Sequence, residues 1–138
     1  MATWPGPWCR LRVMPIVIRE IHASSSPSLL NEEWFVVENT GDKPFSTAGC
    51  TIAVARGQTA RPRPVGTMDP GFTLLPGQKK QVVSGNPGKK AHGKVTATDD
   101  LEVYHLFLGT SLISGPGAVL ILSLKQHEFA RTTYAAPI

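Results

Sequence analysis

The chain has 138 residues, few cysteines and no long hydrophobic run. A membrane-spanning helix needs about 18 or more consecutive apolar residues, and no such stretch occurs, so no membrane partner is expected. The apolar stretch 14–18 is interrupted by Pro15 and followed by charged residues. It has no small-residue cleavage site behind it, so it does not fit a signal peptide. The expected location is the cytoplasm.

Only two cysteines are present, Cys9 and Cys50. Two thiols are too few for the disulfide framework of a small secreted domain. We expect Cys50 to be a buried thiol in a core strand and Cys9 to be an exposed thiol in a tail. A bridge between the two residues is the alternative.

Motifs for catalysis or metal binding are also scarce. The segment 88–95, GKKAHGKV, is one residue short of a phosphate-binding loop, because Val95 stands where a hydroxyl must hold the metal. No C-x-x-C pair and no G-x-S-x-G elbow exists. The other candidate ligands are scattered or adjacent along the chain: His22, His92, His105, His127, Asp99, Asp100 and Glu102. The sequence predicts that the protein is not an enzyme and has no catalytic residue, metal, cofactor or small-molecule substrate.

Two alternating stretches surround a turn-rich connector. Residues 33–39 place Phe35 and Val37 on one face, and residues 49–55 place Cys50, Ile52 and Val54 on one face. Alternation with β-branched and aromatic side chains is typical of half-buried strands. The connector has Asn, Gly and Pro, which favour a turn. We therefore predict an antiparallel pair, whose shared apolar face is covered by a second sheet.

Further strands are expected at 16–23, 72–75, 78–84, 119–124 and 129–134, the last two as a closing hairpin. Pro62 and Pro64 argue against a strand in the segment 57–70, because proline donates no hydrogen bond to a ladder. Thirteen glycines and twelve prolines favour short strands with many turns. The fold class is thus all-β, an antiparallel β-sandwich of about 7–9 strands with no helix beyond a turn or two. Its predicted core is Ile16, Ile18, Phe35, Val37, Cys50, Ile52, Val83, Val119, Ile121 and Phe129.

The stretch from Glu33-Trp34 through the NTGDKP turn to the STAGCTI strand resembles the signature of the lamin-tail domain. The resemblance, to a standalone bacterial-type member, covers 13–138 and implies an immunoglobulin-like sandwich. It also implies a non-catalytic protein-interaction or structural module that acts within a larger assembly. Cys50 departs from the family, which usually carries a core Trp there. Trp34, Leu101 or Tyr104 are the candidates to fill that volume.

Basic residues are concentrated in the segment 56–94. It holds eight of the fourteen Lys and Arg residues but one of the ten Asp and Glu residues. A surface that contacts phosphates needs only such side chains, so nucleic-acid binding is the alternative function. Lysines that protect a strand edge from pairing are the simpler explanation. The candidate anion contacts are Arg56, Arg61, Arg63, Lys79, Lys80, Lys89, Lys90 and Lys94.

Residues 1–12 form a predicted irregular arm that carries Trp4 and Trp8. Two exposed indoles are a large apolar surface, and aromatic side chains are enriched at interface centres. The arm is therefore a candidate contact for a protein partner or for self-association. The alternative is a lid over the end of its own sandwich.

Overall fold

The computed structural model describes residues 15–57, 60–96, 101–113 and 115–135. Within them the fold is all-β, with two short 3-10 turns, η1 (Leu30–Glu32) and η2 (Lys90–His92). No helix in these residues is long and apolar enough to cross a membrane. The strands are β1 (Ile16–His22), β2 (Trp34–Asn39), β3 (Phe45–Ser46), β4 (Thr51–Ala55), β5 (Arg63–Thr67), β6 (Thr73–Leu74), β7 (Lys79–Val83), β8 (Val103–His105), β9 (Val119–Leu124) and β10 (His127–Thr133).

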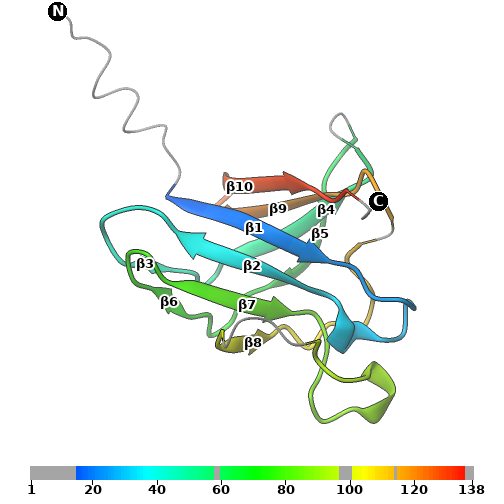
Figure 1. The fold of residues 1–138 in the computed structure, drawn as a ribbon. Helices are drawn as coiled ribbons and strands as arrows, with labels where there is room; N and C mark the ends of the chain where they lie inside the picture. Colours follow the sequence, from blue (N-terminus) through cyan, green and yellow to red (C-terminus); the bar gives the residue numbers. More distant parts are fainter. Residues whose placement is uncertain (1–14, 58–59, 97–100, 114, 136–138) are drawn as a thin grey trace, which may run out of the picture.

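Two four-stranded sheets lie face to face (Figure 1). One has the order β1-β2-β7-β8 and the other β10-β9-β4-β5, while β3 and β6 form a separate two-stranded ribbon. Alternate residues of each sheet point inward and share one hydrophobic cluster, as in a β-sandwich. That main core combines Ile16, Ile18, Phe35, Val37 and Val82 of the first sheet with Ile52, Val54, Leu120, Leu122 and Phe129 of the second.

The predicted pairing of 33–39 with 49–55 is wrong. Both segments form strands, but β2 pairs with β1 and β7, whereas β4 pairs with β9 and β5. The apolar faces of β2 and β4 meet across the core instead of lying side by side. The connector crosses between the sheets and forms β3 on the way. Alternation indicated correctly which face of each strand joins the main core. It contains no information about which strand is the neighbour.

The segment 57–70 contains a strand, contrary to expectation. Pro64 belongs to β5 and is opposite Ala53 of β4, where the register shifts between Ile52 and Ala53. Strand β5 is the end strand of its sheet. Proline is tolerated at such an edge and beside a bulge because no neighbouring strand requires its missing N–H.

The sandwich is also not wholly antiparallel. Strand β8 runs parallel to β7 at the far edge of the first sheet. The described residues form ten strands, more than the seven to nine expected. The extra strands are β3 and β6, which have two residues each and pair with each other. The expected strands on either side of the Pro76-Gly77 turn exist as β6 and β7. These two strands do not pair with each other, because β6 pairs with β3 and β7 pairs with β2.

The closing hairpin is confirmed as β9 and β10. Its turn is shorter than predicted and contains Lys125 and Gln126, both with positive φ, 51° and 70°. Two successive residues in the left-handed region match the twist of a two-residue hairpin. Strand β1 has its own irregularity between Ile18 and Glu20, after which Ile21 packs against the main core.

All ten predicted core residues are buried, but they do not share one core. Seven belong to the main cluster, while Val119 and Ile121 form a second cluster with Ala53 and Ala55. Val83 belongs to a third cluster, with Trp34 and Val36. The main core contains the alternate residues of these strands, so the second and third clusters lie on the outer faces of the two sheets.

A buried carboxylate ties three segments together. Glu33, 1% exposed, precedes β2 and accepts hydrogen bonds from Ser84 Oγ at 2.7 Å and Ser111 Oγ at 2.6 Å. The backbone N–H groups of Leu112 and Ile113 donate to the same carboxylate at 2.7 and 2.9 Å. Four donors satisfy a group that would be costly to bury alone. Glu33 thereby fixes the segment that links β8 to β9.

Candidate functional site

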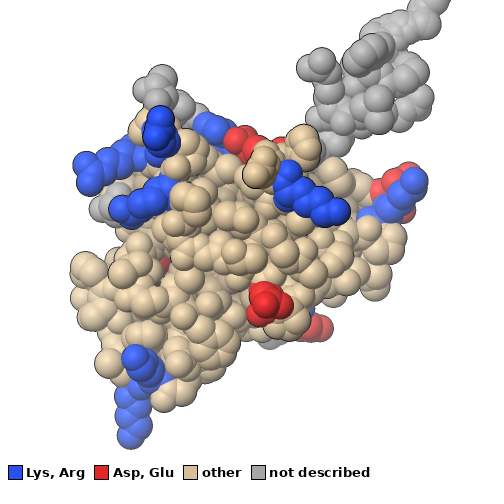
Figure 2. Space-filling view, turned by 180° about the vertical axis from the view of Figure 1, so that it is seen from behind, with Lys and Arg blue, Asp and Glu red and all other residues tan. Residues whose placement is uncertain are grey.

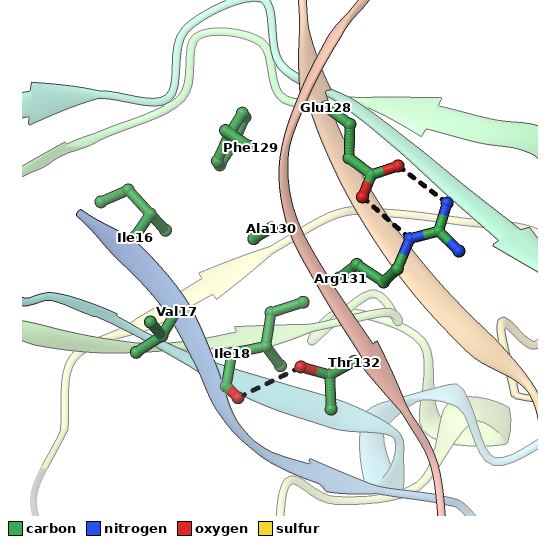
Figure 3. Close-up of a pocket in the computed structure, with 8 residues that line it drawn as sticks. All are labelled: Ile16, Val17, Ile18, Glu128, Phe129, Ala130, Arg131 and Thr132. Atoms are coloured by element: carbon green, nitrogen blue, oxygen red, sulfur yellow. Dashed lines mark hydrogen bonds and ion pairs between the residues drawn. The ribbon is translucent and has the colours of Figure 1, made fainter. Parts of the chain in front are cut away.

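A groove of about 440 Å³ runs between β1 and β10, the end strands that lie on the same side of the two sheets (Figure 3). Its lining is contributed by residues 16–18 of β1 and 128–132 of β10. Ile16, Ile18 and Phe129 belong to the main core, so the groove opens onto the interior of the sandwich. The inward-facing side chains of β1 and β10 thus form the apolar floor of the groove. The sequence did not indicate the groove, because no pattern showed which strands would end the two sheets.

Polar groups lie along the β10 side of this groove. Arg131 donates two hydrogen bonds of 2.8 Å to Glu128, and Figure 3 shows the two side chains paired. The Arg131 hydrogen bond holds the pKa of Glu128 below its ordinary value. A hydrogen bond crosses between the two strands, from Thr132 Oγ1 to the carbonyl of Ile18 at 3.4 Å. The groove therefore has an apolar floor, a charged pair on one side and a long cross-strand contact.

The candidate contacts Trp4 and Trp8 lie outside the described residues. The described chain begins at Pro15, whose carbonyl accepts hydrogen bonds from Thr40 N and Oγ1 at 2.6 and 2.8 Å. Pro15 also lines a second hollow of about 590 Å³ beside the turn 40–45. Because Ile16 lines the β1–β10 groove, the segment that carries both tryptophans joins the domain at one end of this groove.

The eight candidate anion contacts do not form one stripe. Arg56, Arg61 and Arg63 line a hollow of about 250 Å³ where β4 ends and β5 begins. Lys79 and Lys80 lie on β7 of the opposite sheet. Lys89, Lys90 and Lys94 lie in and around η2. Figure 2 accordingly shows Lys and Arg side chains in separate groups toward the margins, with surface between them that carries none.

Lys80 is not available to an anion, since it pairs with Glu102 at 3.3 Å and lies 4.8 Å from the Phe72 ring centroid. Of the neighbouring candidate metal ligands Asp99, Asp100 and Glu102, the first two lie outside the described residues. Within the described ranges, no group of three or more His, Cys, Asp or Glu side chains is placed to hold a metal.

Cys50 is a fully buried free thiol, as expected, but it lies directly before β4 and not within a strand. Burial raises its pKa to about 11. Cys9 lies outside the described residues. Of the candidates for filling the volume of the lamin-tail family's core Trp, Tyr104 packs against the main core. Trp34 belongs to the third cluster, and Leu101 packs against that cluster. No sequence pattern indicated Met68, which is 1% exposed and whose N–H donates to the Cys50 carbonyl at 2.8 Å.

Neither a scan against protein-family models nor a search of curated proteins finds a match for this chain. The lamin-tail resemblance therefore stays a prediction from the sequence.

Proposed function

We propose that this domain is a non-catalytic protein-interaction module of the lamin-tail, immunoglobulin-like type, and that it works by self-association. The observation that carries the proposal is the open groove between β1 and β10 at the point where the tryptophan-bearing segment joins the domain. End strands offer backbone groups to an added chain, and the groove adds an apolar floor. We further propose a cytoplasmic location, in keeping with the free thiol of Cys50.

The occupant of the groove is the N-terminal arm of a second copy. The chain outside the described part includes fourteen residues before Pro15. Fully extended, they span about 3.3–3.6 Å per residue, enough to reach a neighbouring domain. A groove of about 440 Å³ lies within the size range of pockets that hold small ligands, which is enough volume for an indole. Trp4 and Trp8 would supply the aromatic anchors that dominate interface energetics.

The direction of β1 favours a second copy over the same chain. Residues 16–18 of β1 line the groove themselves, so the arm leaves the domain at the groove's end. To occupy its own groove, the arm would have to turn back along β1. An arm from another copy needs no reversal.

Nucleic-acid binding through the whole segment 56–94 has less support. Its basic residues fall in three separate places, and Lys80 is already paired with Glu102. A protein that follows a phosphate backbone needs cations along one continuous surface.

Size-exclusion chromatography with light scattering over a dilution series tests the proposal. We expect the full chain to dimerise with increasing concentration, and a chain without residues 1–12 to stay monomeric with an unchanged melting temperature. Thr132→Lys, which adds bulk and charge in the groove, should also prevent dimerisation. Thr67→Lys, the same change on the exposed edge strand β5, is the matched control and should dimerise normally.

A full chain that stays monomeric at every concentration would contradict the proposal. A deletion that lowers the melting temperature without changing the oligomeric state would show instead that the arm covers its own domain.

A further inference from the structure

Three arginines surround one hollow at the end of the second sheet. Arg56 follows β4 directly, Arg63 begins β5 and Arg61 lies in the connection between them. The hollow has a volume of about 250 Å³, below the roughly 300–1,000 Å³ of pockets for drug-sized ligands. Its remaining wall includes Val54, Ala55, Ser111, Leu112 and Ala118. The space is suited to a small group and its rim is strongly cationic.

None of these arginines has an acidic partner among the described residues. The three ion pairs found there join Arg19 to Glu38, Lys80 to Glu102 and Arg131 to Glu128. The arginine side chains are all exposed, so their donors face solvent. Three like charges around one hollow repel one another and attract an anion.

The wall behind the arginines is apolar and fixed. Val54, Leu112 and Ala118 are buried members of the main core. The Glu33 carboxylate holds Ser111 Oγ and the backbone N–H of Leu112. On the opposite side, Pro62 and Pro64 flank Arg63 and restrict the backbone on which it stands. Low-polarity walls and a rigid backbone both strengthen an ionic contact made at the rim.

We propose that this arginine hollow binds a small tetrahedral oxyanion of the phosphate class. Arginine is suited to this task, because its planar guanidinium donates two parallel hydrogen bonds to phosphate oxygens. Arg56, Arg61 and Arg63 are the ligand residues, and Leu112 and Ala118 form the apolar wall. The site does not involve the arm or the β1–β10 groove, so it stands or falls independently of self-association.

Titration of the full-length chain with inorganic phosphate and with pyrophosphate tests the site, by calorimetry and by amide chemical shifts at low ionic strength. We expect saturable shifts at Ser111, Leu112 and Ala118. The double variant R61Q/R63Q should bind at least about tenfold more weakly, as charged hydrogen bonds are lost. The double variant K89Q/K90Q removes the same charge at η2 and should stay within about twofold of the wild type.

Conservative replacement separates geometry from charge. R61K/R63K keeps the net charge but removes the guanidinium forks, and its affinity should lie between those of the wild type and R61Q/R63Q. An unchanged melting temperature will show that each variant is folded.

Three outcomes would overturn the proposal: shifts that do not saturate, equal weakening in the arginine and lysine double variants, or full affinity in R61Q/R63Q. A DNA duplex serves as the competing probe. Duplex binding that weakens equally in both double variants would indicate a diffuse cationic field and no phosphate site.

Discussion

The two margins of the sandwich are built differently. At the open margin, β1 faces β10 across a groove, with the Thr132 to Ile18 hydrogen bond of 3.4 Å between them. At the closed margin, where β8 and β5 end the two sheets, the chain after β8 crosses from one sheet to the other. Tyr104 of β8 accepts a hydrogen bond from Gly71 N at 3.0 Å and packs on the Phe72 ring.

The closed margin is reinforced by packing and by polar anchors. Leu108 lies over β5 so closely that a Cβ on Gly66 would be 2.9 Å from Leu108 Cδ2. Farther along, Glu33 holds Leu112 and Ile113 in the core. The same chain thus covers one pair of end strands with its own segment and leaves the other pair open. The β1–β10 groove is therefore the margin at which the proposed partner segment would bind.

Glu33→Gln should have the largest effect on stability. The amide replaces one acceptor oxygen with a donor, so the N–H of Leu112 or Ile113 faces another N–H in a buried site. Hydroxyl donors can rotate away, but a backbone N–H cannot. We expect a loss of about 2–4 kcal/mol in the free energy of unfolding, measured by chemical denaturation. Glu20→Gln on the exposed face of β1 is the control, and an equal loss there would contradict the role of Glu33.

Cys50 lies in the core between the margins and gives the stability a pH dependence. Burial raises its pKa from 9.0 to about 11, so the folded state holds the thiol proton more tightly than the unfolded state. The contribution of the Cys50 thiol to the free energy of unfolding is fully present below pH 9. It is lost as the pH rises toward 11, by about 2–3 kcal/mol. Chemical denaturation across this pH range compares Cys9→Ser with the double variant Cys9→Ser/Cys50→Ala, both in reductant. We expect the loss of about 2–3 kcal/mol only in the protein that keeps Cys50. If the free energy of unfolding depends on pH in the same way in both proteins, Cys50 is not the cause of the loss.

The sequence predicted which face of a strand joins the core better than it predicted which strands lie side by side. Alternation placed Phe35 and Ile52 inside correctly, since period 2 identifies the buried side of a strand. It could not show that β2 and β4 belong to different sheets. Runs such as residues 119–122 are apolar at every position, so the pattern could not show that Val119 and Ile121 form a cluster separate from the main core. The groove depends on strand order, which is a tertiary property, and Glu33 gave no signal as a buried anchor because strand ends often carry charge.

Cys50→Trp tests how the centre of the sandwich is filled. Met68 and Tyr104 already pack in or against the main core, and Cys50 itself is fully buried. An indole at this position must displace its neighbours, and we expect a loss of about 1–3 kcal/mol. Thermal and chemical unfolding measure it, with Cys50→Ala as the small-side-chain reference. A stabilised Trp variant would mean that the family's usual residue fits the space.

Tyr104→Phe isolates one contact of the closed margin. The variant keeps the ring on Phe72 but removes the oxygen that accepts from Gly71 N. Leaving that partly buried N–H without its partner should cost about 1 kcal/mol in the free energy of unfolding. Tyr134→Phe, also partly buried against the main core, is the matched control and should change stability by less than about 0.5 kcal/mol. Equal losses would show that the margin does not depend on this hydrogen bond.

Thr132→Val makes the corresponding change at the open margin and should have the smallest effect. Valine has nearly the shape of threonine and a higher strand propensity, and the bond it removes is long. The Ile18 carbonyl lines an open groove, so water can replace the hydroxyl. We expect a change below about 0.5 kcal/mol in the free energy of unfolding, measured beside Tyr104→Phe under identical conditions. A loss equal to that of Tyr104→Phe would mean that the two margins are held equally, and that the β1–β10 groove is a closed seam with no room for an incoming chain.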